Sequence, residues 1–313
     1  MRFLSFAKVN LHLEVLRRRE DGFHELRTIF QTIDLADEIE LLPRRAGGQQ
    51  IELELEGGAA LLADDSNLAW RAANQFLARW GRAGEGVRIR LRKAIPIGGG
   101  LGGGSSNAAT VLLGLCALLG RHPGLTALAE VGAELGSDVP FFLHGGTGLG
   151  TGRGERIERL PDPPAPPLEL WLAVPPVQVS TQEVFAAHRI DPPSAGRALS
   201  AGGRPGERGG RASEVAALPA AWRPLLGWND LEPTCLALYP AVRDVYNRLS
   251  ESGAQAVRLS GSGSTIFAQF ADRASGEAAG HRLASDSIWL AVKTLSREEW
   301  RRRSGLDALS GGN

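Results

Sequence analysis

The chain has 313 residues, of which 43% are hydrophobic and 22% charged, a composition typical of a folded globular protein and not of a disordered one. Its 35 basic residues equal its 35 acidic residues, and this zero formal net charge argues against a general nucleic-acid binder, which needs a basic excess to neutralise phosphates. The two cysteines, Cys116 and Cys235, cannot form a disulfide framework and match no zinc-site spacing, so we expect a reduced, intracellular compartment.

The first half of the chain predicts strands followed by helices. Near-alternating apolar residues predict a strand over 2–16, ended by a turn at Asp21-Gly22. A strict period of two at Ile51–Glu56 and at 87–92 predicts strands with one buried face, which is typical of antiparallel sheets. Apolar residues at helical spacing predict helices over 68–80, where residues 65–67 offer caps, over 105–119, and over 125–135, where Gly136 follows.

The second half begins with a proline-rich segment at 161–167 that predicts a stiff linker. We therefore place an N-terminal domain at 1–160, a C-terminal domain at 165–300 and a tail at 301–313. Residues 195–212 are rich in Gly and Arg without an apolar period, which predicts a flexible surface loop. Within the second domain we expect strands at 168–174, 256–259 and 265–270 and helices at 240–250 and 275–285.

The N-terminus does not predict export, and no segment of the sequence predicts membrane insertion. Residues 1–9 hold too short an apolar stretch, interrupted by Lys8, for a signal peptide, and no run approaches the ~18 to 20 apolar residues that span a bilayer. We expect a cytoplasmic protein with neither a membrane nor a nucleic acid as its partner.

A glycine-rich segment between a predicted strand and a predicted helix dominates the sequence. Six glycines let its backbone approach a ligand closely, and the helix that follows offers unpaired N–H groups and the positive end of its dipole, which favour phosphate. The spacing does not fit G-x-x-x-x-G-K-[ST], and the alternative is a flexible linker. The predicted phosphate-binding residues are Pro96, Ile97, Gly98, Gly99, Gly100, Leu101, Gly102, Gly103, Gly104, Ser105 and Ser106.

Lysine is scarce in this chain. Lys8, Lys93 and Lys293 are its only lysines, and every other basic residue is Arg. A genome rich in G and C would produce such a bias. A retained lysine nevertheless indicates a place where Arg would not serve, because Arg keeps its proton and presents a broad fork, whereas Lys presents a compact charge.

The segment PIGGGLGGGSSNAA resembles the phosphate loop of the GHMP kinases, a family that includes galactokinase, homoserine kinase and mevalonate kinase. Further family motifs are matched in order by residues 7–11 (AKVNL), 21–26 (DGFHEL), 136–142 (GSDVPFF), 229–232 (NDLE) and 260–264 (SGSGS). The resemblance therefore extends from about residue 6 to about residue 270.

The resemblance implies an α+β fold, with an S5-like N-terminal domain and a ferredoxin-like C-terminal domain around an active-site cleft. The doubled glycine motif is most similar to that of a member that uses ATP to phosphorylate the 2-hydroxyl of 4-(cytidine 5′-diphospho)-2-C-methyl-D-erythritol, in the non-mevalonate route to isoprenoid precursors. ATP is thus the implied co-substrate and a small molecule with a cytidine diphosphate group the implied substrate. Mg²⁺ is expected with ATP, but we assign it no protein ligand, because it takes much of its coordination from phosphate and water.

Two other functions stay open at this point. The chain could be another GHMP kinase such as homoserine kinase, against which the DGFH segment (21–24) argues. It could also be a nucleotide-binding regulator that has lost catalysis, against which the presence of Lys8 and Asp138 argues. Both a monomer and a homodimer agree with the sequence.

The resemblance assigns the catalytic roles to Lys8 and Asp138. Asp138 is the general base for the substrate hydroxyl, and Lys8 lies beside it, keeping the carboxylate ionised and favouring an alkoxide-like oxygen. The alternatives are a turn or helix-capping Asp and a solvated strand Lys. Lys93 and Asn67 are further predicted ATP contacts, for which the alternatives are a strand-end lysine in solvent and a helix-capping asparagine.

The resemblance also implies a site for the cytidine substrate. The ring of Phe23 stacks on cytosine while His24 hydrogen-bonds its edge, although many relatives have a Tyr at this position and any bond through its phenol oxygen is lost here. Phe185, four residues after Thr181, forms the other wall of this clamp. Thr181 is a further predicted substrate contact, and Asn10 contacts the diphosphate or a hydroxyl.

Overall fold

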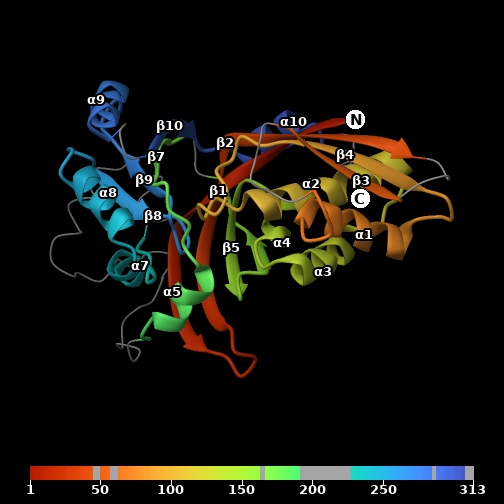
Figure 1. Cartoon of the computed structure of the whole chain (residues 1–313), viewed down its shortest axis with the longest axis horizontal. Helices are drawn as coiled ribbons and strands as arrows, with labels where there is room; N and C mark the ends of the chain where they lie inside the picture. The colour runs from red at the N-terminus through yellow and green to blue at the C-terminus, as the bar shows by residue number, and fades with distance from the viewer. Residues whose placement is uncertain (45–49, 57–62, 163–165, 191–226, 284–286, 307–313) are drawn as a thin grey trace.

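The computed structural model describes residues 1–44, 50–56, 63–162, 166–190, 227–283 and 287–306. The long β1–β2 pair belongs to the first of two sheets and lies between the second sheet with its helices, at the left of Figure 1, and the helices of the first sheet, at the right. The first sheet contains β1 (Arg2–Arg18), β2 (His24–Arg44), β3 (Ile51–Glu56), β4 (Gly86–Arg92), β5 (Thr147–Gly152) and β6 (Arg156–Arg159). The second contains β7 (Glu169–Val174), β8 (Ala256–Leu259), β9 (Ile266–Gln269) and β10 (Ile288–Lys293). The helices are α1 (Leu68–Trp80), α2 (Gly103–Leu119), α3 (Leu125–Leu135), α4 (Val139–Phe142), α5 (Thr181–Ala187), α7 (Glu232–Leu238), α8 (Pro240–Ser250), α9 (Arg273–Leu283) and α10 (Arg297–Ser304).

The 21-residue strand β2 organises the first sheet. One of its edges pairs with β1, while its other edge pairs with β4 over 38–44 and with β5 over 26–31, antiparallel in every case. β3 pairs with β4 in parallel, which corrects the antiparallel arrangement that the alternating pattern predicted. The reason is the connection: α1 lies between these two strands, and a crossover helix returns the chain to the same end of the sheet.

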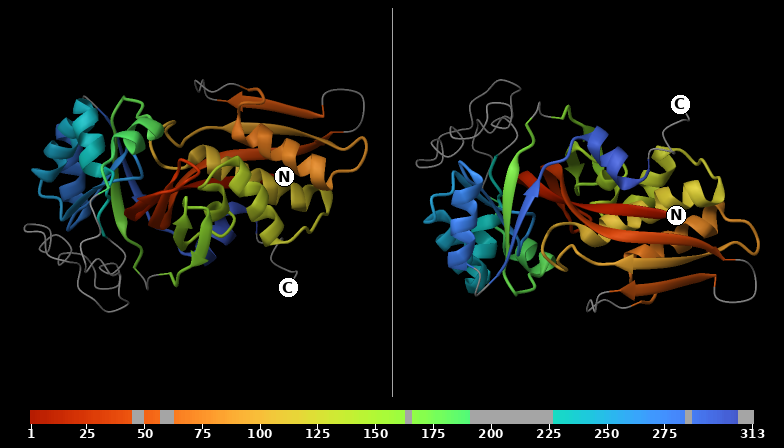
Figure 2. Two further views of the ribbon diagram at one scale, coloured as in Figure 1. Left: turned by 90° about the horizontal axis from the view of Figure 1, so that it is seen from below. Right: turned by 90° about the horizontal axis from the view of Figure 1, so that it is seen from above.

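The helices α1 to α4 cover one face of this sheet (Figures 1 and 2). The predicted bounds of α1 and α3 are confirmed. α2 begins two residues earlier than predicted, at Gly103, because Gly102 before it takes a left-handed backbone conformation that only glycine adopts easily (φ 71°). Most residues of α2 are buried, among them Leu112 and Leu115.

The second sheet is antiparallel throughout, in the order β10-β7-β9-β8. Its own core is formed with α7, α8 and α9, and includes Trp171, Val245 and Leu259. The predicted bounds of α8 and β8 are confirmed, whereas α9 begins two residues before the predicted 275.

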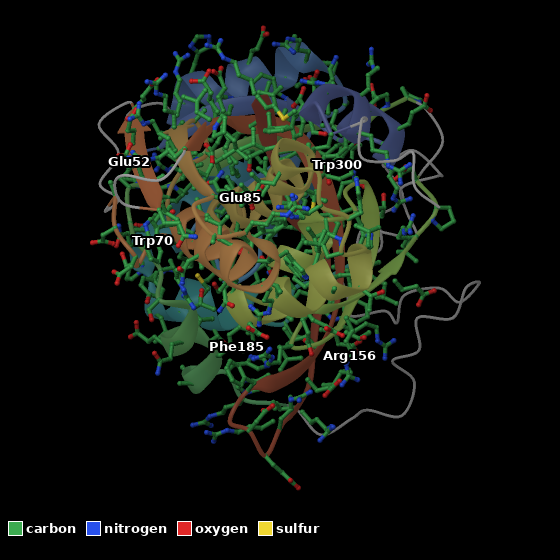
Figure 3. The ribbon with its side chains drawn as sticks, turned by 90° about the vertical axis from the view of Figure 1, so that its right-hand side faces the viewer. Glu52, Trp70, Glu85, Arg156, Phe185 and Trp300 are labelled. Carbon is green, nitrogen blue, oxygen red and sulfur yellow. The ribbon has the colours of Figure 1, made fainter. Side chains whose placement is uncertain are left out.

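After β10 the chain returns to the first sheet. α10 packs there through Trp300, labelled in Figure 3, which is 6% exposed and belongs to the same apolar cluster as residues of α1 and α2. Residues 301–304 are therefore the last turn of a helix and not the start of a tail. The predicted loop at 195–212 and residues 307–313 lie outside the described residues, and the domain limits of 160 and 165 stay predictions.

A third apolar cluster joins the two sheets. Val9 and Leu11 from the middle of β1 pack with Leu172 of β7 and Phe267 of β9, all nearly fully buried. The two-part α+β architecture is thus confirmed. The middle of β1 is packed between the first sheet and the second, which restricts its movement. No helix among the described residues combines the length and the apolar character needed to cross a membrane.

Candidate active site

The middle of β1 presents Lys8 and Asn10 on one face, because alternate residues of a strand point the same way. Register shifts against β2 flank this pair, between Phe6 and Lys8 and between Asn10 and His12. Such bulges redirect side chains, and they are frequent beside active sites. Both side chains are buried although both are polar, so the fold must provide them with partners.

The ammonium group of Lys8 has three acceptors for its three N–H donors. Its Nζ donates to Asn10 Oδ1 at 2.7 Å and to the Gly100 carbonyl at 2.8 Å, and it lies 3.3 Å from Asp138 Oδ2. The Lys8 side chain is 4% exposed, which excludes a solvated strand lysine. The structure therefore brings the two predicted catalytic residues together as an ion pair across two distant segments of the chain.

Asp138 lies where the turn after α3 meets the short helix α4. It holds the position before the first residue of α4, yet its side chain makes no capping hydrogen bond there. Its side chain is 31% exposed, so the carboxylate contacts Lys8 while part of the side chain stays open to a ligand. This geometry argues against the helix-capping interpretation and leaves the carboxylate available as a base.

The glycine-rich loop is folded against the second sheet's turn between β8 and β9. Thr265 N donates to the Gly99 carbonyl at 3.1 Å and Ser260 Oγ to the Gly100 carbonyl at 3.0 Å. Gly100 has φ 73°, and a Cβ there would lie 2.3 Å from the Ser260 carbonyl oxygen, so only glycine fits. The loop leads into α2, whose first amides have no side-chain cap because Gly102 precedes them.

The two serines of the loop have different surroundings. Ser106 is buried, and its Oγ donates to the Phe6 carbonyl at 2.6 Å and lies 2.7 Å from Ser5 Oγ, so this hydroxyl ties α2 to β1. Ser105 is half-buried, and its Oγ lies 3.6 Å from the place that a Cβ of Gly136 would take, toward the loop that carries Asp138. Ser105 is therefore the better placed of the two for a ligand.

Lys93 lies beneath the phosphate loop in a buried ion pair. Its Nζ is paired with Asp37 and lies 3.2 Å from Asn107 Oδ1. Asp37 is fully buried and also accepts hydrogen bonds from the amides of Ala94 and Ile95, both at 2.8 Å. Lys93 is not a solvent-exposed strand end, and its charge is compensated within the protein. Contact with ATP stays a prediction for this residue.

The remaining predicted ATP contacts lie in this loop or beside it. Asn67 caps α1, since its Oδ1 accepts from the Ala69 amide at 3.0 Å. Leu68, next to it, would lie 3.4 Å from a Cβ at Gly104, so the start of α1 adjoins the loop. Leu101 is buried and its carbonyl accepts from the Lys8 amide at 3.0 Å, whereas Ile97 is 41% exposed and Pro96 half-buried.

The SGSGS segment at 260–264 completes the enclosure of Lys8. A Cβ at Gly261 would lie 3.7 Å from Lys8 Nζ and 3.3 Å from Asn10 Oδ1. Asn229 holds this segment, because its Nδ2 donates to the carbonyls of Leu259 at 2.9 Å and Gly261 at 2.7 Å. The NDLE and SGSGS motifs are thus one structural unit that supports Lys8.

The β1–β2 hairpin carries Phe23 and His24 and brings His24 to α5, whose Phe185 is labelled in Figure 3. The His24 ring stacks on the Phe185 ring with centroids 5.1 Å apart and planes at 26°. Phe23 is 52% exposed at the hairpin tip, and the Arg153 guanidinium lies 4.8 Å from its ring centroid. Phe185 therefore adjoins His24, not Phe23.

Two features of this region were missed by sequence reasoning. Arg153, in the turn between β5 and β6, contacts Phe23, but one Arg in an arginine-rich chain gives no signal. Thr181 Oγ1 lies 2.8 Å from Ser262 Oγ, which links the start of α5 to the SGSGS segment. Thr181 and Phe185 are four residues apart on one helix, so α5 connects the SGSGS segment to the ring that stacks on His24.

Burial, with the positive charges of His188 and Arg18 nearby, lowers the pKa of His24 below its ordinary value. The ring is therefore neutral near pH 7, with one nitrogen as donor and the other as acceptor. A neutral imidazole suits a base edge such as that of cytosine, which offers both a donor and acceptors.

Comparison with known families identifies the class of protein to which this fold and site belong. Residues 67–146 match the family described as GHMP kinases N terminal domain, and residues 215–287 match GHMP kinases C terminal. A homoserine kinase from Cytophaga hutchinsonii has the same fold, with a TM-score of 0.65 at 21% identity over 95% of each chain. Fold and site together define a GHMP kinase, a class that uses ATP as co-substrate.

Closer relatives narrow the class. Proteins named 4-diphosphocytidyl-2-C-methyl-D-erythritol kinase are 41% identical in Pelotomaculum thermopropionicum, over 94% of this chain and 97% of that protein, and 43% identical in Moorella thermoacetica, over 90% and 92%. A solved 4-(cytidine 5′-diphospho)-2C-methyl-D-erythritol kinase is 36% identical, with a TM-score of 0.72 over 94% and 99%. The chain belongs to the family of 4-diphosphocytidyl-2-C-methyl-D-erythritol kinases.

Proposed function

We propose that this protein transfers the γ-phosphoryl group of ATP to the 2-hydroxyl of 4-(cytidine 5′-diphospho)-2-C-methyl-D-erythritol, giving the 2-phosphate and ADP. One observation carries the proposal: the 3.3 Å pair of Lys8 and Asp138 lies beside the glycine-rich loop, in a chain 36–43% identical to proteins of that name.

The residues divide the chemistry between them. The substrate hydroxyl gives its proton to Asp138 as its oxygen forms the new bond to the γ-phosphorus. The bond from that phosphorus to the β–γ bridging oxygen breaks, and its electron pair leaves with ADP. Lys8 keeps Asp138 ionised and stabilises charge on the attacking oxygen, while the amides at the start of α2 hold the phosphates.

The residues at the phosphate loop agree with a Mg²⁺ ion that travels with ATP. Within the described part of the chain no three His, Cys, Asp or Glu side chains cluster as a metal site. Mg²⁺ keeps several waters and takes phosphate oxygens as ligands, so a nucleotide bound at α2 supplies most of its coordination. Bound there, the ion would neutralise charge on the β- and γ-phosphates.

Phe23, His24 and the α5 residues are the proposed cytidine site. Homoserine carries no base, so a homoserine kinase has no use for an exposed aromatic ring beside a neutral imidazole. The intact Lys8–Asp138 pair argues likewise against a regulator without catalysis.

The test is a coupled ADP-release assay with three acceptors. We expect turnover with the cytidine diphosphate substrate and none above background with homoserine or mevalonate. Turnover of homoserine at a comparable kcat/KM would refute the proposed acceptor, and ATP binding without turnover of any of the three would favour the regulator.

A further inference from the structure

Asn10 can accept a hydrogen bond from Lys8 only if the oxygen of its side-chain amide faces the ammonium group. A neighbouring threonine, Thr28, favours this orientation of the amide. Lys8 Nζ donates to Asn10 Oδ1 at 2.7 Å, so the Asn10 oxygen must face the ammonium. The opposite end of the amide, Nδ2, donates to Thr28 Oγ1 at 2.7 Å. Both ends of the Asn10 side chain are thus bonded in the buried interior.

The Thr28 hydroxyl can only accept from Asn10. It has one proton, and that proton is directed to the His12 carbonyl, 2.7 Å away. A carbonyl has no proton to give, so the lone pairs of Oγ1 remain for Asn10, and only Nδ2 satisfies them. Thr28 therefore favours the amide orientation that sends Oδ1 toward Lys8.

The backbone fixes the position of this hydroxyl. Thr28 is 1% exposed on β2, where it pairs with Leu13 of β1 on one side and with Gly150 of β5 on the other. Its methyl Cγ2 would lie 3.1 Å from a Cβ at Gly150, so the glycine leaves room for Thr28 in this rotamer. A central strand of a six-stranded sheet is a rigid mount for such a group.

The geometry points to Thr28 as a positioning residue that orients Asn10 and, through it, the catalytic Lys8. The inference rests on the proposed phosphoryl transfer. The inference adds to that site one side chain, Thr28, that is not itself a proposed ligand contact. We call the series of contacts from the His12 carbonyl through Thr28 and Asn10 to Lys8 and Asp138 the relay.

The experiment compares three substitutions on β2. Thr28→Val keeps the shape but leaves Asn10 Nδ2 without an acceptor, and we expect kcat to fall about tenfold, as for one hydrogen bond of ordinary strength. Thr28→Ser keeps the hydroxyl, so kcat should stay within about twofold. Thr32→Val is the matched control: Thr32 is fully buried opposite Lys8 in the register, and in the described part of the chain its hydroxyl makes no hydrogen bond. KM for ATP should be unchanged in all three.

A second readout does not depend on activity. Labelling with ¹³Cε-lysine yields signals from just three residues, and Lys8→Arg identifies the Lys8 signal. Thr28→Val should move that signal and leave those of Lys93 and Lys293 in place, while Thr28→Ser and Thr32→Val should move none. Should Thr28→Val not fold, Thr28→Ala takes its place with the same expectations.

The results separate the relay from the proposed function. Wild-type kcat and an unmoved Lys8 signal in Thr28→Val would overturn the relay. So would an equal loss in Thr28→Ser, since keeping the hydroxyl would then not preserve the rate and any change at this buried position would have the same effect. An inactive wild-type protein would refute the proposed acceptor, and the Lys8 signal would still decide the relay.

Discussion

The two ends of the candidate site are built in opposite ways. At the transfer centre, Lys8 is 4% exposed and each of its donors has an acceptor from a different part of the chain. At the hairpin tip, Phe23 is 52% exposed and its ring lies against the Arg153 guanidinium. The first end is held together by the protein's own groups, and the second presents a surface that a ligand can cover.

This difference follows from what each end must do. Stabilising charge in a transition state needs groups that do not reorganise during the reaction, and burial provides that rigidity. Recognising a base by stacking needs an accessible aromatic face. We therefore expect substitutions at the transfer centre to act on kcat and substitutions at the hairpin tip to act on KM for the cytidine substrate.

The largest effect is expected from Asp138→Ala. Removing the general base should lower kcat by about 10² to 10⁴, while ATP affinity measured by calorimetry stays within a few fold. Near wild-type turnover would show that Asp138 takes no part in proton transfer. Loss of ATP affinity to the same extent as kcat would show that the carboxylate serves binding.

Lys8→Arg should be the next most damaging change. The planar guanidinium cannot place its donors on Asn10 Oδ1, the Gly100 carbonyl and Asp138 as the ammonium does, so we expect kcat to fall about 10²-fold with little change in KM for ATP. Lys293→Arg is the matched control, because Lys293 is exposed on β10 and should tolerate the change. Equal steady-state rates for both variants would remove the argument from lysine scarcity.

Local signals explain what the sequence predicted well. α1 and α8 have their predicted bounds because a cap at Asn67 and a proline at Pro240 lie within a few residues of the helix starts. Lys8, Asp138 and the glycine loop were found through short motifs that the family resemblance could match. The pairing of Lys8 with Asp138 was implied by that resemblance and is seen in the structure.

Long-range contacts explain what the sequence could not supply. Asp37 fixes Lys93, and Thr28 contacts Asn10, but neither residue stands in a recognisable motif. The need for glycine at position 100 comes from the Ser260 carbonyl, 160 residues away. The parallel pairing of β3 with β4 depends on the crossover through α1, which the alternating pattern of a strand does not encode.

Phe23→Ala tests the exposed end of the comparison. Stacking of a base on an aromatic ring contributes roughly 1 to 3 kcal/mol, so KM for the cytidine substrate should rise about 5- to 150-fold, with kcat and KM for ATP within a few fold. Leu16→Ala is the control: this apolar residue of the same hairpin is 38% exposed and should leave KM unchanged. Equal rises in KM for ATP and KM for the cytidine substrate would contradict a cytidine clamp. A lower kcat with both KM values unchanged would show that Phe23 acts on the transfer step and not on substrate binding.

The smallest effect, and the finest test of the comparison, concerns pH. The pKa of His24 is lowered by burial and by the charges of His188 and Arg18, so the ring is neutral at pH 7 and gains a proton only as the pH falls through that lowered pKa. The protonated ring has two donors and no acceptor, so it loses half of its match to the cytosine edge. KM for the cytidine substrate should then rise a few-fold between about pH 8 and about pH 5.5, while KM for ATP does not follow.

His24→Asn separates this titration from others in the protein. Asparagine keeps a donor and an acceptor but does not titrate, so KM for the cytidine substrate should become nearly independent of pH over the same range. Stability gives a second check with a defined sign. Because the unfolded chain binds the His24 proton more readily than the folded one, the wild type should lose stability relative to His24→Asn as the pH falls below about 6.5. If KM for the cytidine substrate rises equally in both proteins on acidification, the pH dependence comes from a group other than His24.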